Sequence, residues 1–390
     1  MTSAEDRRRA REPGRGRSAE EPRDIPPRGL KDVAVRLWTQ ISNDHVTLVA
    51  AGVAFYSLLA LFPLLTALVS IYGLIADAGN IEEHLSKLQG LLPHDVIEIM
   101  RQQLIQLSQA EAPRLSLLFI AALLFSLWSA NKGVTSMFEA MNIAYGEREK
   151  RNIFVLTAMT LLFTFGFILF IVITLTAIVA LPPILALIGL DAVTHSLLSL
   201  ARWPVLLVFV ITANALIYRF GPSREKARWV WLSWGSVAAA LAWMVMSVGF
   251  SFYAANFANF NETYGSMGAV IAVMTWTWLS AVIVIAGAEL NAELEHQTAK
   301  DTTTGRERPL GRRGAQMADT VGPATQQTRQ NPEAAEKPDI LQPAHKRRDT
   351  QRSRRPPDDG GSWLARFVVQ MLLKAIRQKS GQQERASRRR

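Results

Sequence analysis

Six apolar runs without a charged residue divide the middle of this sequence, and they constrain its fold more than any other feature. A helix of about 20 apolar residues spans the hydrocarbon layer of a membrane. A soluble domain of this size rarely stays free of charge over such lengths, because its surface meets water. Two of the runs, 115–131 and 203–218, are shorter than 20 residues. We expect their helices to continue past Lys132 and Arg202, whose long side chains can reach the membrane surface. The predicted spans cover residues 46–76, 115–141, 153–181, 200–219, 229–255 and 266–289.

The third run, residues 152–190, is long enough for one helix with a turn or for two short helices, with a break at Pro182-Pro183. The loop charges decide between these alternatives, because basic loops stay in the cytoplasm. With six spans, the basic loops 142–152 and 219–228 fall on the same side as both tails. The sequence therefore predicts six spans, two cytoplasmic termini and an outer segment at 184–200, either a loop or a short helix at the membrane surface.

The predicted fold class is all-α, a polytopic membrane helix bundle with disordered basic tails. Residues 1–29, rich in Arg, Glu, Pro and Gly, predict a disordered N-terminal tail. Residues 30–45 predict an amphipathic helix on the inner membrane surface, because four apolar residues recur at helical spacing: Leu30, Val33, Leu37 and Ile41. The six-helix domain then covers residues 46–292.

The C-terminal part divides into a predicted disordered linker at 293–361, a basic amphipathic helix at 362–380 and a basic tail at 381–390. The formal net charge of the chain is +10. A basic amphipathic helix suits an anionic membrane surface, and docking on a protein is the alternative. The expected partners are the lipid bilayer and anionic lipids bound by the basic tails. A homo-oligomer is left open, and no nucleic acid is expected.

Ionisable groups inside the predicted spans suggest function, because burying them in lipid is unfavourable. Lys132 and Glu139 lie seven residues apart on one face of the second span, and Asn131 adjoins Lys132. Glu289 and Asn291 lie near the inner end of the sixth span. We expect a polar path through these five residues, with a Lys132–carboxylate pair acting as a gate or proton-linked relay. The alternatives are a structural ion pair and a side chain at a helix end that extends to the membrane surface.

Two further features lie in or beside the spans. Four polar residues before the sixth span predict either an outer mouth or a capped loop: Asn259, Asn261, Glu262 and Tyr264. Pro63 interrupts the first span and predicts a kink, either static or a gating hinge.

No catalytic constellation is visible in the sequence. The chain contains no cysteine, and its six histidines lack zinc-ligand spacing. No Gly-x-x-x-x-Gly-Lys-Ser/Thr phosphate loop is present. We therefore expect no enzyme, no metal and no cofactor.

Several motifs, taken in order, resemble those of the YihY/BrkB family of bacterial inner-membrane proteins. The resemblance covers about residues 33–295 and is carried by Ala50–Pro63, Trp128–Gly133, Ala140–Tyr145, Glu149–Arg151, the Pro222 loop with Arg224 and Arg228, Tyr264–Gly268, Trp276 and Gly287–Ala292. It implies a six-span inner-membrane protein whose biochemical role is largely unassigned. The motifs give no support to the family's older ribonuclease label, because they lie in membrane helices and lack metal ligands.

The expected function is a transporter or flippase-like exporter of a lipid or a small polar solute. This expectation rests on the polar path and on the link of some family members to the movement of lipid precursors. A non-transporting envelope scaffold that acts through the basic tails is the alternative. A membrane-bound ribonuclease is a second, disfavoured alternative.

Overall fold

The computed structural model describes residues 4–75, 101, 117–187, 192–256 and 267–330. The chain divides into two compact units, Met1–Ile340 and Leu341–Arg390. The second unit, with the predicted 362–380 helix and the 381–390 tail, lies outside the described residues, as do the four residues of the predicted outer mouth: Asn259, Asn261, Glu262 and Tyr264.

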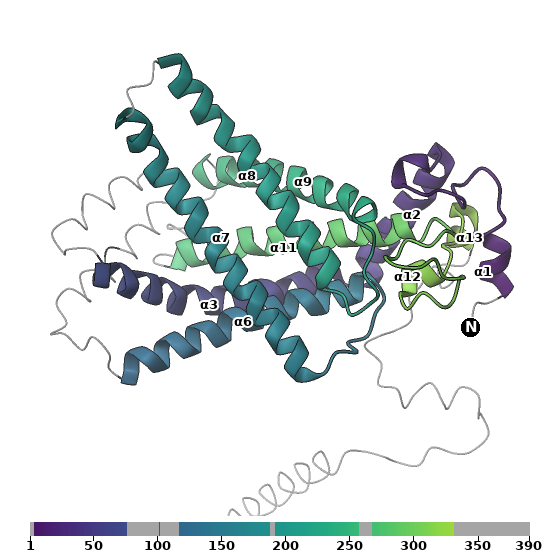
Figure 1. The fold of residues 1–390 in the computed structure, drawn as a ribbon, viewed down its shortest axis with the longest axis horizontal. Coiled ribbons are helices and arrows are strands. Elements are labelled where there is room, and N and C mark those ends of the chain that lie inside the picture. The colour runs from purple at the N-terminus through teal and green to yellow at the C-terminus, as the bar shows by residue number, and fades with distance from the viewer. Residues whose placement is uncertain (1–3, 76–100, 102–116, 188–191, 257–266, 331–390) are drawn as a thin grey trace, which may run out of the picture. The chain divides into compact units, whose positions relative to one another are not determined.

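The described part of the chain is helical, which confirms the all-α prediction there, and its one strand-like pairing is an antiparallel bridge between Ala227 and Thr303. Six helices of 28–35 residues dominate (Figure 1): α3 (Val46–Ile75), α6 (Leu117–Ala144), α7 (Ile153–Leu187), α8 (Ala192–Phe220), α9 (Trp229–Asn256) and α11 (Gly268–Glu295). The shorter elements are α1 (Ala4–Arg9), a 3-10 turn (Pro22–Asp24), α2 (Pro27–Asn43), α12 (Gln316–Asp319) and α13 (Thr325–Gln330).

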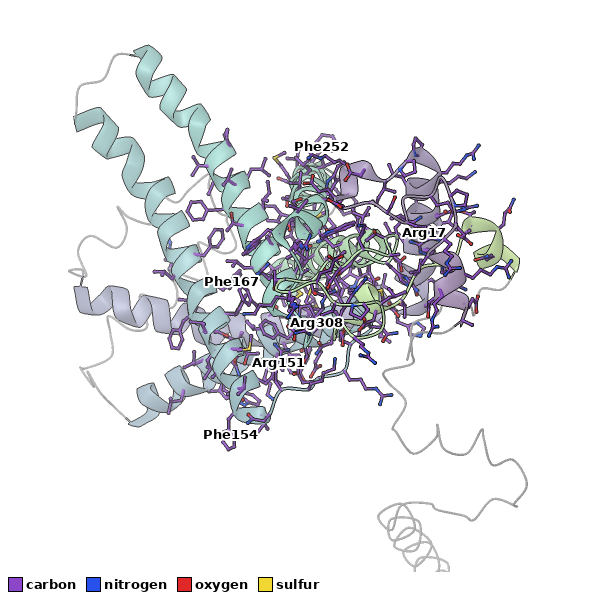
Figure 2. All side chains as sticks on the ribbon, turned by 45° about the vertical axis from the view of Figure 1, so that its right-hand side comes forward. Arg17, Arg151, Phe154, Phe167, Phe252 and Arg308 are labelled. Carbon is purple, nitrogen blue, oxygen red and sulfur yellow. The ribbon has the colours of Figure 1, made fainter. Side chains whose placement is uncertain are left out.

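Three segments in the described ranges are long and apolar enough to cross a membrane: Ile153–Phe170, Trp229–Ala254 and Val270–Glu295. The segments on α7 and α9 carry large exposed apolar side chains, as lipid-facing helices do. Phe154 and Phe167 on α7 are 81% and 58% exposed, and Phe252 on α9 is 62% exposed (Figure 2). Shorter apolar stretches cover Val46–Ala60 on α3 and Pro204–Phe220 on α8.

The centre of the bundle is α11, which packs along α3 and α9 and also contacts α2 and α6 (Figure 1). Glycines permit the closest helix contact, because they bring two backbones together without an intervening side chain. A Cβ atom on Gly235 of α9 would lie 2.2 Å from the carbonyl oxygen of Gly287 on α11. The small residues of α9 therefore fix its approach to α11.

The helices around the predicted 184–200 loop differ from expectation. Helix α7 continues to Leu187, past the Pro182-Pro183 pair, and α8 begins at Ala192, so both helices extend into the predicted outer loop. An apolar environment explains this correction, since a helix broken in hydrocarbon would leave backbone groups without hydrogen bonds.

Both segments predicted as disordered contain ordered structure, which corrects the predicted 1–29 tail and the first part of the predicted 293–361 linker. Residues 4–29 pack with residues 296–327 beside α2 (Figure 1), and we call these two segments the cap. Composition predicted disorder because the segments contain few apolar residues. The structure compensates with buried arginines whose guanidinium groups donate to backbone carbonyls.

Candidate functional site

The last turns of α11 and the residue pair that follows them carry buried polar side chains at every second position: Glu289, Asn291, Glu293, Glu295 and Gln297, each at most 1% exposed. At 3.6 residues per turn, positions 289, 293 and 297 share one face, whereas 291 and 295 lie on another. Buried charges require partners. We call these five side chains, together with Arg36 and Arg224, the polar layer.

Arg36 of α2 binds the face of α11 that carries Glu293 and Gln297. Its Nε donates to Glu293 Oε2 at 2.5 Å, and its Nη2 donates to Gln297 Oε1 at 2.8 Å. The remaining donor, Nη1, reaches the carbonyl oxygen of Pro323 in the cap at 3.0 Å. Arg36 and Glu293 are both 0% exposed. One guanidinium group therefore ties α2, α11 and the cap together.

The second face of α11 meets α9 and the α8–α9 loop. Asn291 Oδ1 accepts from the Gly235 amide at 2.7 Å, and its Nδ2 donates to the Leu232 carbonyl at 3.1 Å. Arg224 donates to both oxygens of Glu295 at 2.6 Å. Burial lowers the pKa of Arg224, but the adjacent Glu295 carboxylate outweighs burial and raises it.

Among the polar-layer residues of α11, Glu289 lies farthest from the C-terminal end of the helix. It is 0% exposed, and its neighbour Ala288 belongs to the hydrophobic core that also holds Tyr145 and Tyr218. Burial raises the pKa of Tyr145, Arg224 opposes that shift, and the charges of Glu295 and Glu289 add to it. A neutral phenol thus lies within electrostatic reach of two buried carboxylates.

The loops after α6 and α8 are joined beside the polar layer. Asn142 Oδ1 accepts from the Ser223 amide at 2.7 Å, and Asn142 Nδ2 donates to Glu149 at 3.1 Å. Arg151 pairs with Glu149 at 2.6 Å and donates to the Gly221 carbonyl at 2.7 Å. Burial raises the pKa of Glu149, but the hydrogen bonds from Arg151 and Asn142 outweigh burial and lower it to about 2.

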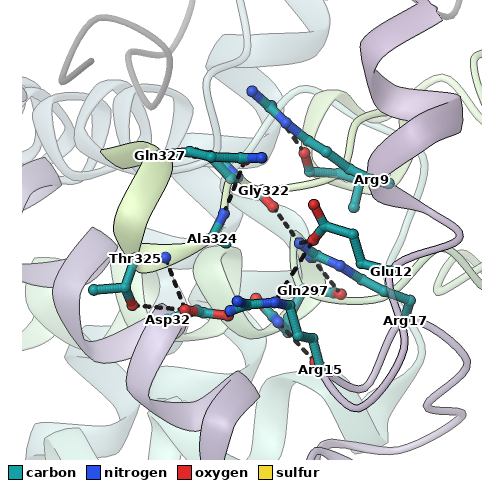
Figure 3. A network of polar contacts seen from close by, with 12 residues as sticks. Arg9, Glu12, Arg15, Arg17, Asp32, Gln297, Gly322, Ala324, Thr325 and Gln327 are labelled. Carbon is teal, nitrogen blue, oxygen red and sulfur yellow. Dashed lines mark hydrogen bonds and ion pairs between the residues drawn. The ribbon is translucent and has the colours of Figure 1, made fainter. Parts of the chain in front are cut away.

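A second polar network joins the two segments of the cap (Figure 3). Arg17 donates to the carbonyls of Gln297 at 3.1 Å and Gly322 at 2.7 Å, and it pairs with Glu12 at 2.9 Å. Gln297 Nε2 donates in return to the Arg15 carbonyl at 2.7 Å. The N-terminal segment is therefore hydrogen-bonded into the C-terminal one.

Asp32 of α2 anchors both segments of the cap. It accepts from Arg15 at 2.6 Å and from the Thr325 hydroxyl at 2.6 Å (Figure 3). Burial raises the pKa of Asp32, but the hydrogen bonds from Thr325 and Arg15 outweigh burial and lower it. The carboxylate is thus held in its charged form.

The predicted polar path is divided by the structure. Glu289 and Asn291 both lie in the polar layer. Lys132 is half-buried on α6, has its Nζ 5.9 Å from the Trp128 ring centre, and forms no ion pair with a described residue. Glu139 is exposed on the same helix, and Asn131 is half-buried.

The remaining predicted features are placed only in part. Pro63 lies within helix α3, which runs without interruption from Val46 to Ile75. The kink at Pro63 stays a prediction. Within the described ranges, no three His, Asp or Glu side chains form a group that could hold a metal ion.

Sequence reasoning missed the arginines of the polar layer and the cap. Asp32, Arg36 and Gln40 recur at a spacing of four residues, so they form a polar stripe on α2 that runs beside the expected apolar one. All three residues of this stripe are buried in the structure, together with Val33 of the apolar stripe. A second signal was also present in the sequence: a polar residue stands at every second position from 289 to 297.

Comparisons with known proteins place the chain in a family. Residues 37–310 match the family described as virulence factor BrkB. The chain is 28% identical over 251 residues to the ribonuclease-like protein YfkH of Bacillus subtilis (strain 168), a match that covers 63% of this chain and 88% of that protein. It is 26% identical over 268 residues to a UPF0761 membrane protein of Vibrio campbellii, covering 66% and 80%.

No solved structure matches the chain. The matched residues, 37–310, include all six long helices and the polar layer except Arg36. The chain is therefore a membrane protein, helical in its described part, that belongs to the BrkB virulence factor family.

Proposed function

We propose that this protein is a six-span transporter of the bacterial inner membrane, with both termini in the cytoplasm, that exports a lipid or a small polar solute in a flippase-like manner. The observation that carries the proposal is Glu289, a fully buried carboxylate within the membrane-spanning window of α11. Ionisable residues are rare inside membrane helices and mark ion or substrate pathways.

The position of Glu289 suits a coupling role. Helix α11 contacts α2, α3, α6 and α9, so any shift of α11 changes packing across the bundle. A carboxylate that gains or loses a proton in this setting changes the relative stability of two helix arrangements. The driving force in this proposal is a proton gradient, and Glu289 is the group that responds to it.

The test is a transport assay in proteoliposomes with wild type, Glu289→Gln and a matched control, Glu139→Gln. Glu139 is also a carboxylate of a long membrane helix, but it is exposed. The assay follows the flip of a fluorescent phosphatidylglycerol and the uptake of a panel of small polar solutes under an imposed pH gradient. We expect Glu289→Gln to lower flux about tenfold or more, as loss of an essential proton carrier does, and Glu139→Gln to retain it.

Two outcomes of this assay would contradict the proposal. Equal flux in all three proteins would contradict the role of Glu289, and no flux above protein-free vesicles for any probe would contradict transport. Melting midpoints of the three proteins serve as the control for folding.

The envelope scaffold is the second candidate, and the cap is the observation that favours it. The cap is an ordered surface built from both ends of the described chain. Arg306→Glu/Arg312→Glu separates the two functions, because both side chains are exposed on the cap and lie outside the long helices. A scaffold that acts through these residues loses its function, whereas a transporter keeps its flux.

The ribonuclease alternative is tested with the intact protein and labelled transfer RNA. Binding that falls with salt is expected for any basic surface. Binding without cleavage would eliminate the enzyme.

A further inference from the structure

The loop between α8 and α9 lies where apolar helix surface gives way to polar chain. The apolar stretch of α8 ends at Phe220, the membrane-spanning window of α9 begins at Trp229, and the two helices pack together. Residues 219–229 therefore lie at the level where lipid headgroups meet protein.

Three cations of this region lack an ion pair with any described residue: Arg219, Lys226 and Arg228. Their neighbour Arg224 is bound to Glu295 at 2.6 Å. Glu225, the only carboxylate of the loop, faces Arg308 at 3.4 Å. The positive charge of the loop is therefore not neutralised by the described protein.

Two of these cations lie near the same aromatic ring, and Arg219 Nη1 also donates to the Ala227 carbonyl. Lys226 Nζ lies 5.0 Å from the centre of the Phe220 ring, and Arg219 Cζ lies 5.9 Å from the same ring. Arg219 also stacks on Trp229 at 4.4 Å. Two like charges on one ring repel each other, so a bound anion would stabilise their arrangement.

The backbone of the loop is fixed before any ligand binds. Ala227 forms an antiparallel bridge with Thr303 of the cap. On either side of it, the Arg228 amide donates to the Thr302 carbonyl at 2.9 Å, and the Thr304 amide donates to the Lys226 carbonyl at 2.8 Å. Such preorganisation lowers the entropic penalty of binding.

Apolar side chains next to the cations indicate the source of the anion. The adjoining turns of α8 and α9 expose five of them: Leu216, Val230, Trp234, Val237 and Leu241. A free phosphate ion would make no use of this surface, whereas an acyl chain would cover it.

We propose that Arg219 and Lys226, supported by Phe220 and Trp229, bind the phosphate of an anionic phospholipid whose acyl chains lie along the exposed apolar surface of α8 and α9. Arg228 supplies further positive charge beside them. The site is independent of the transport proposal, because it requires no movement of substrate.

The experiment titrates full-length protein in a neutral detergent with phosphatidylglycerol or phosphatidylcholine and counts bound lipids by native mass spectrometry. Arg219→Gln/Lys226→Gln removes the two central cations. Arg306→Gln/Arg312→Gln removes two exposed cations of the cap and is the control of equal charge. We expect roughly 30-fold weaker phosphatidylglycerol binding in the first variant, since it removes two basic residues and each one near an anionic headgroup contributes about fivefold. We expect no change in the control.

A conservative variant and a free anion complete the test. Arg219→Lys/Lys226→Arg keeps both charges and should bind phosphatidylglycerol about as well as wild type, which separates loss of the site from loss of folding. Equal losses in both glutamine variants would overturn the proposal in favour of diffuse charge attraction. Saturation by inorganic phosphate, with equal binding of the two lipids, would overturn the assignment to a phospholipid.

Discussion

At the residue scale, burial rather than distance distinguishes the ion pairs of this protein. Arg36 and Glu293 meet at 2.5 Å with no exposed surface, while Arg23 and Glu21 meet at 2.6 Å with Arg23 73% exposed. Solvent screens the exposed pair. A buried charge that loses its partner is left without compensation.

Arg36→Ala should therefore lower the free energy of unfolding by about 3–5 kcal/mol, the usual effect of breaking a buried ion pair. Arg23→Ala should change it by less than about 1 kcal/mol, as for exposed pairs. Denaturant unfolding in detergent, followed by tryptophan fluorescence, measures both. Similar losses in the two variants would show that burial of the Arg36 pair is not decisive.

The second prediction at this scale concerns acid. The folded-state pKa of Glu149 is lowered from 4.5 to about 2. Its contribution is therefore present above about pH 4.5 and is lost as the pH falls towards 2. Glu149→Gln should be less stable than wild type at neutral pH, and the difference should shrink across this window. Melting midpoints between pH 6 and pH 3 measure this difference. For the control Glu20→Gln, at an exposed site, the difference from wild type should stay constant over the same pH range.

At the element scale, α2 buries a polar stripe beside part of its apolar one. Asp32, Arg36 and Gln40 are buried against α11 and the cap, whereas Trp38 is 80% exposed and Leu30 is also exposed. The polar side of α2 is its packing side because α11 and the cap offer complementary charged and carbonyl groups there. Val33 of the apolar stripe is also buried and Ile41 packs against the core of the bundle, so Leu30 and Trp38 are the large apolar side chains that α2 exposes.

The contact between α9 and α11 gives the prediction at this scale. Gly235→Ala would place a Cβ atom 2.2 Å from the Gly287 carbonyl oxygen, so the two helices must separate. We expect a loss of about 1–3 kcal/mol, as in other overpacked cores. Gly249→Ala on the same helix meets no atom within 4 Å and should be neutral or slightly stabilising. Equal melting midpoints for the two variants would contradict the close contact.

At the scale of the whole molecule, the cap joins the two ends of the described chain. The Arg17 carbonyl accepts from the Ala299 amide at 2.8 Å, and the Ala19 carbonyl accepts from the Thr298 hydroxyl at 2.7 Å. These contacts close a loop that includes the entire helix bundle. The stability of the bundle should therefore depend on its first residues.

Two deletions test this dependence. Removal of residues 1–19 leaves the carbonyls of Gln297 and Gly322 without their Arg17 donor, and we expect a loss of roughly 3 kcal/mol or more, because several buried partners are lost together. Removal of 341–390 deletes the separate unit and should leave the melting midpoint of the remainder unchanged. The reverse order of effects would show that the cap does not support the bundle.

The sequence by itself determined the helices, because apolar runs can satisfy their backbone groups in lipid only by forming helices, and that requirement is local. The bounds of α3, α9 and α11 agree with the predicted spans to within six residues. The family motifs and the presence of Glu289 and Asn291 at the end of a span were also visible in the printed residues.

Only the tertiary structure decided which polar residues meet. Arg36 and Glu293 are 257 positions apart, and Arg17 and Gly322 are 305 apart, so no local pattern links them. Composition predicted disorder for the segments that contain residues 4–29 and 296–327, because each segment alone has too little apolar surface to fold. Together they fold, since the buried charges and carbonyls of one segment are satisfied only by the other and by the ends of α2 and α11.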